Sequence, residues 1–343
     1  MRVSVVVITH DEAPRLRLTL DSLVLQHVAP PLDSVEIVVV DDGSSDETAR
    51  VIEEARSQAE LVVVRHDQAK GRSAARNAGA RHATGDVLLM LDGDVLVGPN
   101  AASEHASAHA RFGKAMGRGA TYHLRGTRFF ADPETGTPMP GAEAHVARMS
   151  EHQMRASLVT RDEVRARFAD IAARSEPGIY AGSGPKLLYE LEMRALHAIP
   201  DASILWMAAS GHNFSMPREE FLSAGGYEER LTINEHRELA LRLQKNGLRV
   251  TPVDAARSIH MLHRVGWRDP AGEPDWERTF YERHPTLATK LMSVFWLSLA
   301  GDKGVPEEAR ILSLEQLEEI VQRGTRHDYD ALRRAHAKLG ALD

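Results

Sequence analysis

The stretch Val87-Leu88-Leu89-Met90-Leu91-Asp92-Gly93-Asp94 is a short apolar run that ends in two carboxylates one residue apart. A continuous apolar run of this length indicates a strand that is buried on both faces, as in a parallel sheet. Two carboxylates at the end of such a strand can jointly hold a hard divalent cation, which can in turn bridge two phosphate oxygens. An Asp-x-Asp triplet alone also fits a turn or a helix cap, so the surrounding sequence must decide.

The sequence before this stretch alternates between strand and helix patterns. Three further apolar runs rich in Val, Ile and Leu predict strands over 3–8, 35–40 and 61–64. Amphipathic or alanine-rich patterns predict helices over 14–26, 45–59 and 72–82, the second of them capped by Ser44 and Ser45. This β-α-β-α-β-α-β order predicts a doubly wound α/β fold with a mostly parallel sheet, in which ligands bind beyond the carboxyl ends of the strands.

The pattern changes after residue 112, and we divide the chain there. Residues 1–112 form the α/β half described above, and residues 113–200 are predicted to be a mainly helical insertion, either a surface feature or a part of an acceptor site. Residues 201–270 return to the α/β pattern, with a strand and loop over 203–216, helices over 218–224 and 234–246, and a strand over 248–253. Residues 271–343 are predicted to be a helical C-terminal extension, with helices over 314–322 and 329–339.

Composition narrows the class of protein. The 343 residues are 43% apolar and 27% charged and include no cysteine, which fits a globular chain and excludes disulfides, thiolate zinc sites and a cysteine nucleophile. The net charge of −7 argues against a nucleic-acid partner. The apolar start is interrupted by Asp11 and Glu12, too early for a signal peptide, and no apolar run approaches the roughly 20 residues of a membrane helix, so we expect a cytoplasmic location.

Two other polar groups follow predicted strands. Asp41 and Asp42 end the second strand, where they could accept hydrogen bonds from a base N–H or a ribose hydroxyl, or could simply form a turn. Arg72 and Arg76 lie four residues apart, hence on one face of the predicted helix 72–82. Such a pair near a helix N-terminus suits a phosphate or a uracil carbonyl, although a solvated helix face would look the same.

These motifs occur in an order that resembles the family 2 glycosyltransferases of the GT-A fold. The resemblance includes the opening stretch 5–12, the stretch Gly211-His212-Asn213-Phe214-Ser215-Met216-Pro217-Arg218-Glu219-Glu220-Phe221 with Gly225-Gly226-Tyr227-Glu228-Glu229 after it, and the helix 234–243 followed by Gly247. It covers about residues 1–265 and leaves the insertion and the C-terminal extension without a motif.

The resemblance implies a nucleotide-sugar donor, usually UDP-linked, and a Mn²⁺ or Mg²⁺ ion. It assigns donor contacts to residues that follow the first, second and fourth strands and to two arginines of the third helix: Thr9, Asp11, Asp41, Asp42, Arg72, Arg76, Asp92 and Gly93. It assigns the metal to Asp94, with Asp92 as a ribose or metal partner and His260 and His263 as further ligands after the last strand. Neutral imidazole ligands suit Mn²⁺ better than Mg²⁺.

The sequence departs from the family at the position of the catalytic base. The family's helix begins with Glu-Asp, in which the Asp takes the acceptor proton, and here the corresponding residues are Glu235 and His236. Imidazole could replace the base, Glu235 could act instead, or the acceptor could need little activation. We expect His236 to be the base, with a pKa near 6.5 because the helix N-terminus and Glu235 act on it in opposite directions.

The sequence thus predicts an inverting glycosyltransferase that moves a hexose from a UDP-sugar to an acceptor hydroxyl. The alternative is a catalytically silent module that only binds nucleotide sugars. A sugar nucleotidyltransferase is disfavoured because the first strand lacks a glycine-rich loop after it. The sequence names neither the sugar nor the acceptor, which could be a small molecule, a glycan or a peptide, and it leaves homo-oligomer formation open.

Overall fold

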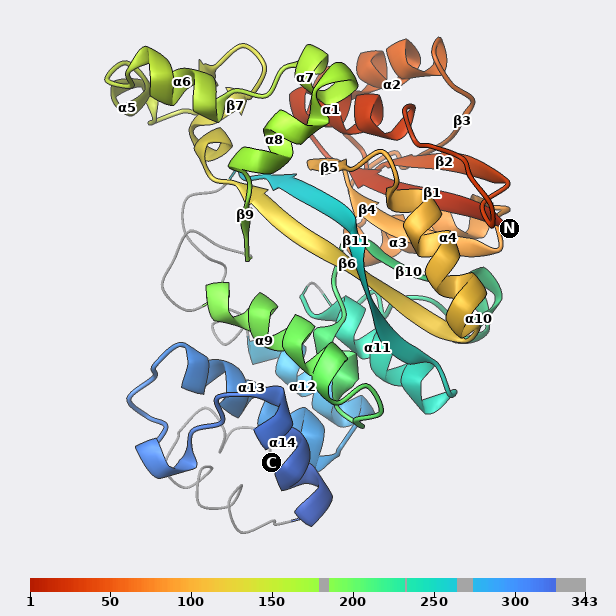
Figure 1. Ribbon diagram of the computed structural model, residues 1–343, viewed down its shortest axis with the longest axis vertical. Helices are drawn as coiled ribbons and strands as arrows, with labels where there is room; N and C mark the ends of the chain where they lie inside the picture. Colours follow the sequence, from red (N-terminus) through yellow and green to blue (C-terminus); the bar gives the residue numbers. More distant parts are fainter. Residues whose placement is uncertain (179–184, 232, 264–273, 325–343) are drawn as a thin grey trace.

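The computed structural model describes residues 1–178, 185–231, 233–263 and 274–324, which form a large sheet flanked by helices (Figure 1). The sheet has nine strands in the order β3-β2-β1-β4-β10-β6-β11-β5, and β9 pairs with β6 beside this path. Its strands are β1 (Arg2–Thr9), β2 (Ser34–Asp41), β3 (Leu61–Arg65), β4 (Val87–Asp92), β5 (Val95–Val97), β6 (Ala115–Leu124), β9 (Glu176–Pro177), β10 (Phe214–Pro217) and β11 (Arg249–Met261). A separate hairpin consists of β7 (Phe130–Asp132) and β8 (Thr137–Pro138).

The helices fall into three groups along the chain. The first group covers the N-terminal half of the sheet, the second forms short helices in the predicted insertion, and the third forms the lower layer in Figure 1. In chain order they are α1 (Ala13–Leu23), α2 (Thr48–Arg56), α3 (Arg72–His82), α4 (Ala101–Phe112), then α5 (Glu143–Val146), α6 (Glu151–Ser157), α7 (Arg161–Ala166), α8 (Phe168–Arg174), then α9 (Pro185–Ala198), α10 (Arg218–Ser223), α11 (Glu235–Lys245), α12 (Pro274–Arg283), α13 (Leu287–Leu299) and α14 (Leu314–Arg323). The helix predicted over 329–339 lies outside the described residues.

The four predicted apolar runs are parallel neighbours in the sheet, which confirms the doubly wound α/β fold. Strand β1 pairs with β2 and β4, and β2 pairs with β3, all in parallel. In this register Thr9 lies beside Asp41, and Ile8 lies beside Asp92. The polar residues that end β1, β2 and β4 therefore meet at one edge of the sheet.

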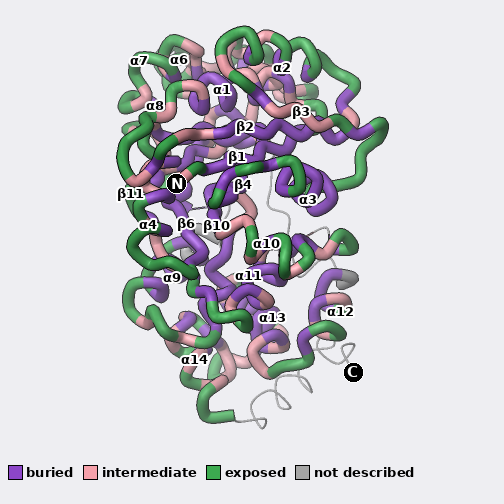
Figure 2. Tube along the Cα trace, turned by 90° about the vertical axis from the view of Figure 1, so that its right-hand side faces the viewer, coloured by how far each residue is buried: buried purple, intermediate pink, exposed green. Residues whose placement is uncertain are grey.

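Alternate side chains of these strands enter two different hydrophobic cores. Val3, Val5 and Val7 pack with apolar residues of α1, α2 and α4. Val6 and Ile8 point to the opposite face and pack with α3 and with residues of the C-terminal half. Figure 2 shows β1, β2 and β4 as buried along most of their length, whereas β3 at the edge of the sheet is only partly buried. Burial on both faces explains why the runs are continuously apolar instead of alternating.

The helix expected to start at Ser44 and Ser45 begins later, at Thr48, so that capping prediction was wrong. Asp46 fills this role: its Oδ1 accepts hydrogen bonds from the Thr48 backbone N–H (3.0 Å) and hydroxyl (2.6 Å). Ser44 and Ser45 instead bond to the loop after β1, where the Asp11 N–H donates to Ser44 Oγ and the Ser45 N–H donates to Asp11 Oδ1.

A long strand of the main sheet, β6, lies within the range 113–200, for which the sequence analysis expected a mainly helical insertion. Strand β6 pairs in parallel with β11 and antiparallel with β10, so residues 115–124 belong to the sheet. The sequence hides this strand because it contains glycines and polar residues instead of a run of Val, Ile or Leu. A Cβ atom on Gly119 would lie 2.2 Å from Asn213 Nδ2, so the close approach of the Asn213 side chain requires glycine there.

Within the described residues, no helix is both long and apolar enough to span a bilayer.

We expect Gly119→Ala to destabilise the fold, because the added methyl group would overlap the buried Asn213 amide. Overpacking of this kind typically costs about 1–3 kcal/mol. Urea denaturation at pH 7 measures the difference. Gly98→Ala is the matched control, since a Cβ atom there meets its nearest neighbour at 3.5 Å, an ordinary contact. Equal unfolding free energies for the two variants would contradict the close packing of β6.

Candidate active site

The polar strand ends open into a cavity of about 540 Å³ that both halves of the chain line. The sheet contributes residues from β1, β4, β6 and β11, and α3 contributes Arg72 and Arg76. The opposite wall comes from α9, α11 and α13, including Trp296 and Leu299 of the C-terminal extension. The cavity therefore joins the predicted donor half to α11, which carries a family-like motif, and to α9 and α13, which carry none.

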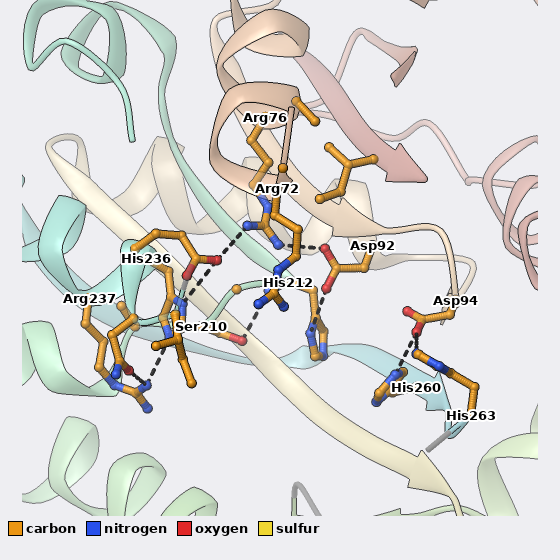
Figure 3. A pocket seen from close by; sticks show the side chains of 18 of the residues that line it. Arg72, Arg76, Asp92, Asp94, Ser210, His212, His236, Arg237, His260 and His263 are labelled. Atoms are coloured by element: carbon orange, nitrogen blue, oxygen red, sulfur yellow. Dashed lines mark hydrogen bonds and ion pairs between the residues drawn. The ribbon is translucent and has the colours of Figure 1, made fainter. Parts of the chain in front are cut away.

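Asp94 and the two predicted histidines come together at one end of the cavity (Figure 3). The Asp94 Oδ2 atom lies 2.9 Å from His260 Nε2 and 2.8 Å from His263 Nε2. One ligand atom from each of the three residues lies within 4.8 Å of the others, which is a spacing that one metal ion can bridge. Strand pairing fixes the arrangement, because His260 on β11 pairs with Val95, the residue after Asp94.

Electrostatics keep Asp94 in its anionic form. Burial acts to raise the pKa of Asp94, but the adjacent His260 and His263 outweigh it and hold that pKa well below its usual range. Burial likewise acts to lower the pKa of His260, but Asp94 raises it above the ordinary value. Asp94 Oδ1 is buried and has no hydrogen-bond partner. A carboxylate with a free oxygen and two imidazoles is a donor set that suits a transition metal such as Mn²⁺.

Asp92 is engaged differently from Asp94, although both come from the same triplet. Its Oδ1 accepts a hydrogen bond of 2.7 Å from Arg76 Nη2, and Arg76 Nη1 donates to Glu235 Oε1 at 2.8 Å. Arg76 is only 1% exposed and therefore forms a buried bridge between β4 and α11. Burial acts to lower the pKa of Arg76, but these two carboxylates raise it above its ordinary value. The sequence analysis assigned Arg76 to the nucleotide, whereas the structure commits its terminal nitrogens to two carboxylates.

Of the other predicted donor residues, Asp42, Arg72 and Thr9 line the cavity. The Asp42 carboxylate accepts hydrogen bonds from the Lys70 and Gly71 N–H groups and lies 2.6 Å from His66 Nδ1. Burial acts to raise the pKa of Asp42, but these hydrogen bonds lower it overall. Asp42 is thus an ionised group that is fixed by the last residues of the loop leading into α3.

Asp11, Asp41 and Gly93 were also assigned to the donor, but they are not among the residues that line the cavity. Asp41 Oδ1 accepts from the Ser44 N–H, as in a turn. Asp11 has a left-handed backbone (φ 51°), and its Oδ1 accepts from the N–H groups that follow β2. Gly93 leaves room for a neighbour, since a Cβ atom there would lie 2.5 Å from Glu12 Oε1.

Glu12 is a cavity residue that the sequence analysis did not select. Burial, together with the negative charges of Asp94 and Asp92, raises the pKa of Glu12 well above its ordinary value. It is therefore the carboxyl group in this cluster that holds a proton most readily. The adjacent Asp11 was chosen instead because a sequence does not show which of two neighbouring carboxylates points inward.

Glu235 and His236, the predicted catalytic pair, lie at the other end of the cavity. Arg237 Nη1 lies 3.0 Å from His236 Nε2, and because a guanidinium can only donate, Nε2 must be the acceptor. The proton of the neutral ring is therefore on Nδ1, which lies 3.9 Å from Glu235 Oε1.

Burial lowers the pKa of His236 to about 4, with Arg237 acting in the same direction. The predicted pKa near 6.5 was therefore wrong, because the sequence did not show that the ring would be buried beside arginines. Burial acts to raise the pKa of Glu235, but His236, Arg72 and Arg76 lower it well below the ordinary value. Glu235 is thus a carboxylate and His236 a neutral imidazole at neutral pH.

Further cavity residues lie on segments where the sequence showed no motif. Glu192 of α9 accepts a hydrogen bond of 2.7 Å from Arg237 Nη2 and lies 3.5 Å from Arg118 Nη2 of β6. The Arg237 guanidinium also lies over the ring of Trp296 from α13, 5.2 Å from its centroid. Only the three-dimensional packing of these segments against α11 reveals them as part of the site.

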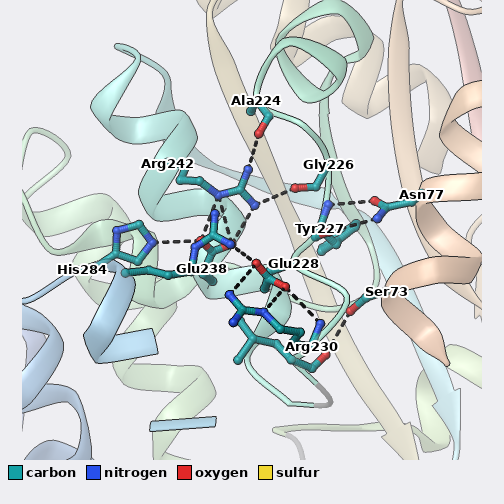
Figure 4. Close-up of polar contacts among 12 residues, drawn as sticks. Ser73, Asn77, Ala224, Gly226, Tyr227, Glu228, Arg230, Glu238, Arg242 and His284 are labelled. Carbon is teal, nitrogen blue, oxygen red and sulfur yellow. Dashed lines mark hydrogen bonds and ion pairs between the residues drawn. The ribbon is translucent and has the colours of Figure 1, made fainter. Parts of the chain in front are cut away.

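The glycine-containing motif at 225–229 has a structural role (Figure 4). Asn77 of α3 donates to the Tyr227 carbonyl at 3.0 Å and accepts from the Tyr227 N–H at 2.7 Å. Arg242 donates to the Gly226 carbonyl and to Glu238, which also bonds to His284. These contacts tie the loop to both α3 and α11 and so fix the position of Glu235 relative to Arg76.

The fold places the chain in a known class. It is similar to S. aureus TarS residues 1–349 in complex with UDP-GlcNAc (TM-score 0.53, 15% identity, covering 100% of this chain and 84% of that one). It is also similar to the mannosyltransferase PcManGT from Pyrobaculum calidifontis in complex with GDP-Man and Mn²⁺ (TM-score 0.50, 16% identity, 99% and 73% covered). At these identities the likeness establishes a fold, which is the GT-A glycosyltransferase fold.

Residues 4–156 match the family model described as glycosyl transferase family 2. The validoxylamine A glucosyltransferase of Streptomyces hygroscopicus subsp. jinggangensis is 28% identical over 299 residues, which make up 86% of this chain. The corresponding protein of S. hygroscopicus subsp. limoneus is 27% identical over the same share. This chain spans 63% and 58% of the lengths of these two relatives.

The buried histidines should make the fold sensitive to acid. Burial lowers the pKa values of His105, His109, His212 and His236 to about 4, below the ordinary value of 6.5. Between these values the unfolded chain binds protons that the folded chain does not, so the unfolding free energy should fall as the pH drops from about 6.5 to about 4. Urea unfolding across this range measures the change, and a curve that stays flat would contradict the burial of neutral imidazoles.

Proposed function

We propose that the protein is a metal-dependent, inverting hexosyltransferase that transfers a sugar from a UDP-sugar to an acceptor hydroxyl. The observation that carries this proposal is the position of Asp94, His260 and His263 at one end of a cavity whose other end holds Glu235 and His236. The fold supports it, since similar structures hold UDP-GlcNAc in one case and GDP-Man with Mn²⁺ in another. The two relatives that match 86% of this chain are described as glucosyltransferases.

The donor would bind along the edge of the sheet where β1, β2 and β4 end. Asp94, His260 and His263 would hold the ion, which when bound would neutralise charge that develops on the leaving diphosphate. Arg72 lines the same cavity and would add a second positive charge close to that diphosphate. Asp42, held ionised at the start of α3, would accept hydrogen bonds from the base or the ribose.

In the transfer step the acceptor oxygen would form a bond to the anomeric carbon while the bond from that carbon to the diphosphate breaks. The acceptor proton must pass to a base. We assign this role to Glu235, which reverses the preference drawn from the sequence. The Arg237 contact occupies the lone pair of His236 and leaves its Nδ1–H as a donor toward the acceptor oxygen. A diphosphate beside Arg72 would also offset the positive charge that lowers the pKa of Glu235.

The acceptor would enter between α9, α11 and α13, opposite the donor. This wall combines aliphatic side chains with the Trp296 ring and with Glu192, which pairs with Arg118 and Arg237. A small molecule, a glycan or a peptide could each present polar and apolar groups that contact such a wall. A screen is therefore needed to identify the acceptor class.

A silent nucleotide-sugar-binding module is the second candidate, and one observation favours it. Arg76 already pairs with Glu235, and neither Glu235 nor His236 has a pKa near neutrality. Hydrolysis of UDP-sugars in the presence of Mn²⁺ and without acceptor separates the two functions. Measurable turnover would exclude the silent module, whereas tight binding with no turnover toward water or any screened acceptor would favour it.

UDP binding should require a divalent ion. We expect calorimetry to show UDP binding with Mn²⁺ and little binding in EDTA. Asp94→Asn should weaken Mn²⁺ binding by at least ~10–100-fold. That is the usual effect of removing a residue that only hydrogen-bonds to a metal ligand, and Asp94 would be a ligand itself. Mn²⁺ affinity should also fall as the pH drops below neutrality, because His260 has a raised pKa and must lose its proton to bind the ion. Asp254→Asn, an exposed carboxylate paired with His197, is the control. Undiminished UDP affinity in EDTA would rule out the metal.

The choice of base can be tested by two variants. Glu235→Gln should lower kcat by ~10²–10⁴, the usual size of a general-base contribution, whereas His236→Gln should lower it less because only a donor is lost. The wild-type rate should be flat from pH 6 to 8, since both groups titrate at or below about 4. A rate that rises between pH 6 and 7 and loses this dependence in His236→Gln would instead assign the base to His236.

The same reaction reports the stereochemistry. NMR of the product should show a linkage of the opposite anomeric configuration to the donor, as a single displacement requires. Retained configuration would contradict the inverting mechanism without affecting the family assignment. Melting temperature and UDP affinity of each variant check that loss of the Arg76 partner at position 235 has not disturbed the fold.

A further inference from the structure

Two histidines that line the cavity have ring nitrogens without partners. His123 of β6 is 2% exposed, and neither Nδ1 nor Nε2 has a hydrogen-bond partner. His212 lies just before β10, with 15% of its side chain exposed, and its buried Nε2 is also without a partner, while its Nδ1 lies 3.9 Å from Asp92 Oδ2. A buried polar atom left unpaired typically costs about 1–3 kcal/mol. Three such atoms in one cavity therefore point to a ligand that pairs with them.

The two rings lie beside the metal-binding residues without belonging to them. The ring centroids of His123 and His212 are 5.3 and 5.8 Å from that of His260. Among the residues that the structure describes, the set close enough to share an ion consists of Asp94, His260 and His263. His123 and His212 are thus available to a different group that occupies the same cavity.

Their position falls between the two ends of the proposed reaction. His212 contacts Asp92, which Arg76 links to Glu235, so the contacts run continuously from His260 to the proposed base. Figure 3 shows His212 between His236 and His260. A diphosphate on the metal and an acceptor hydroxyl at Glu235 must lie on opposite sides of the anomeric carbon. The sugar ring of the donor would therefore occupy the space beside His212 and His123.

The chemistry of the two rings matches a sugar hydroxyl. His123 is 2% exposed and the His212 side chain 15% exposed, and burial favours the neutral form of an imidazole. A neutral imidazole has one donor and one acceptor nitrogen, and a hydroxyl group can serve both. An uncharged polar lining of this kind recognises hydroxyls, whereas the arginines of α3 are suited to phosphate.

Both rings are held on rigid parts of the fold. His123 pairs with His260 in the β6–β11 register, so the two side chains project from the same face of the sheet. His212 precedes Asn213, which has a left-handed backbone (φ 52°). The Asn213 Nδ2 group donates to the Ala120 and Ala256 carbonyls, and its Oδ1 lies 2.9 Å from His105 Nε2. Rigid placement is what discrimination among similar sugars requires.

We propose that His123 and His212 bind hydroxyl groups of the donor's sugar ring and determine which sugar the enzyme accepts. This inference rests on the proposed function, since it requires a nucleotide-sugar donor in the cavity. It adds a specificity-determining pair that acts on the sugar and not on the nucleotide or the metal.

The test compares UDP with UDP-glucose, UDP-galactose and UDP-GlcNAc by calorimetry in the presence of Mn²⁺. His123→Leu and His212→Leu remove the ring nitrogens while keeping an apolar side chain of similar size. Each should leave UDP affinity within about twofold of the wild type and lower affinity for the preferred UDP-sugar by ~10-fold. The differences in affinity among the three donors should shrink in parallel.

His109→Leu is the matched control, because His109 is equally buried, has a pKa lowered to about 4 and lies outside the cavity. Unchanged UDP-sugar affinity and donor ranking in both cavity variants would overturn the proposal, as would an equal loss in His109→Leu. If His123→Leu does not fold, His212→Leu alone decides, since its side chain lies at the cavity surface and is 15% exposed. A wild type that binds neither UDP nor any UDP-sugar would instead contradict the proposed function.

Discussion

The buried Arg76 guanidinium is the interaction that joins the two halves of this protein into one site. It reaches from α3 to Asp92 at the end of β4 and to Glu235 at the start of α11. Removing one partner from a buried ion pair typically costs about 3–5 kcal/mol, because the remaining charge is left without compensation. Arg76 therefore helps to fix the distance between the Asp94 end and the Glu235 end of the cavity. The Asn77 and Arg242 contacts around residues 224–228 hold the same two helices together from behind.

The cavity is built by pairing charges and by leaving a few polar atoms unpaired. Asp94 faces two imidazoles, Asp92 and Glu235 share Arg76, and Glu192 contacts Arg118 and Arg237. These pairs keep most of the carboxylates ionised although they are buried, whereas burial and the charges of Asp94 and Asp92 raise the pKa of Glu12. The atoms left without a partner, on Asp94, His123 and His212, lie where the proposed metal ion and the sugar would bind.

The sequence predicted the half of the fold in which local patterns determine the structure. The apolar runs of β1, β2 and β4 are buried on both faces, so they were visible as strands, and the carboxylates that follow them had to meet at one edge. Strand β6 was missed because Gly117 and Gly119 replace side chains that would collide with Ser215 and Asn213. The contribution of α13 was missed because only tertiary packing brings Trp296 to the cavity, beside Arg237 of α11. The pKa of His236 could not be predicted, since it depends on Arg237 and on burial.

The central claim is that Asp94, His260 and His263 bind one metal ion at the end of the cavity that receives the diphosphate. Anomalous diffraction from crystals grown with Mn²⁺ and UDP tests it most directly. The account predicts one strong manganese peak within coordination distance of all three side chains, with the UDP phosphates on its open side. A peak that contacts Asp92 but neither histidine, or UDP bound in the cavity with no manganese peak, would contradict it.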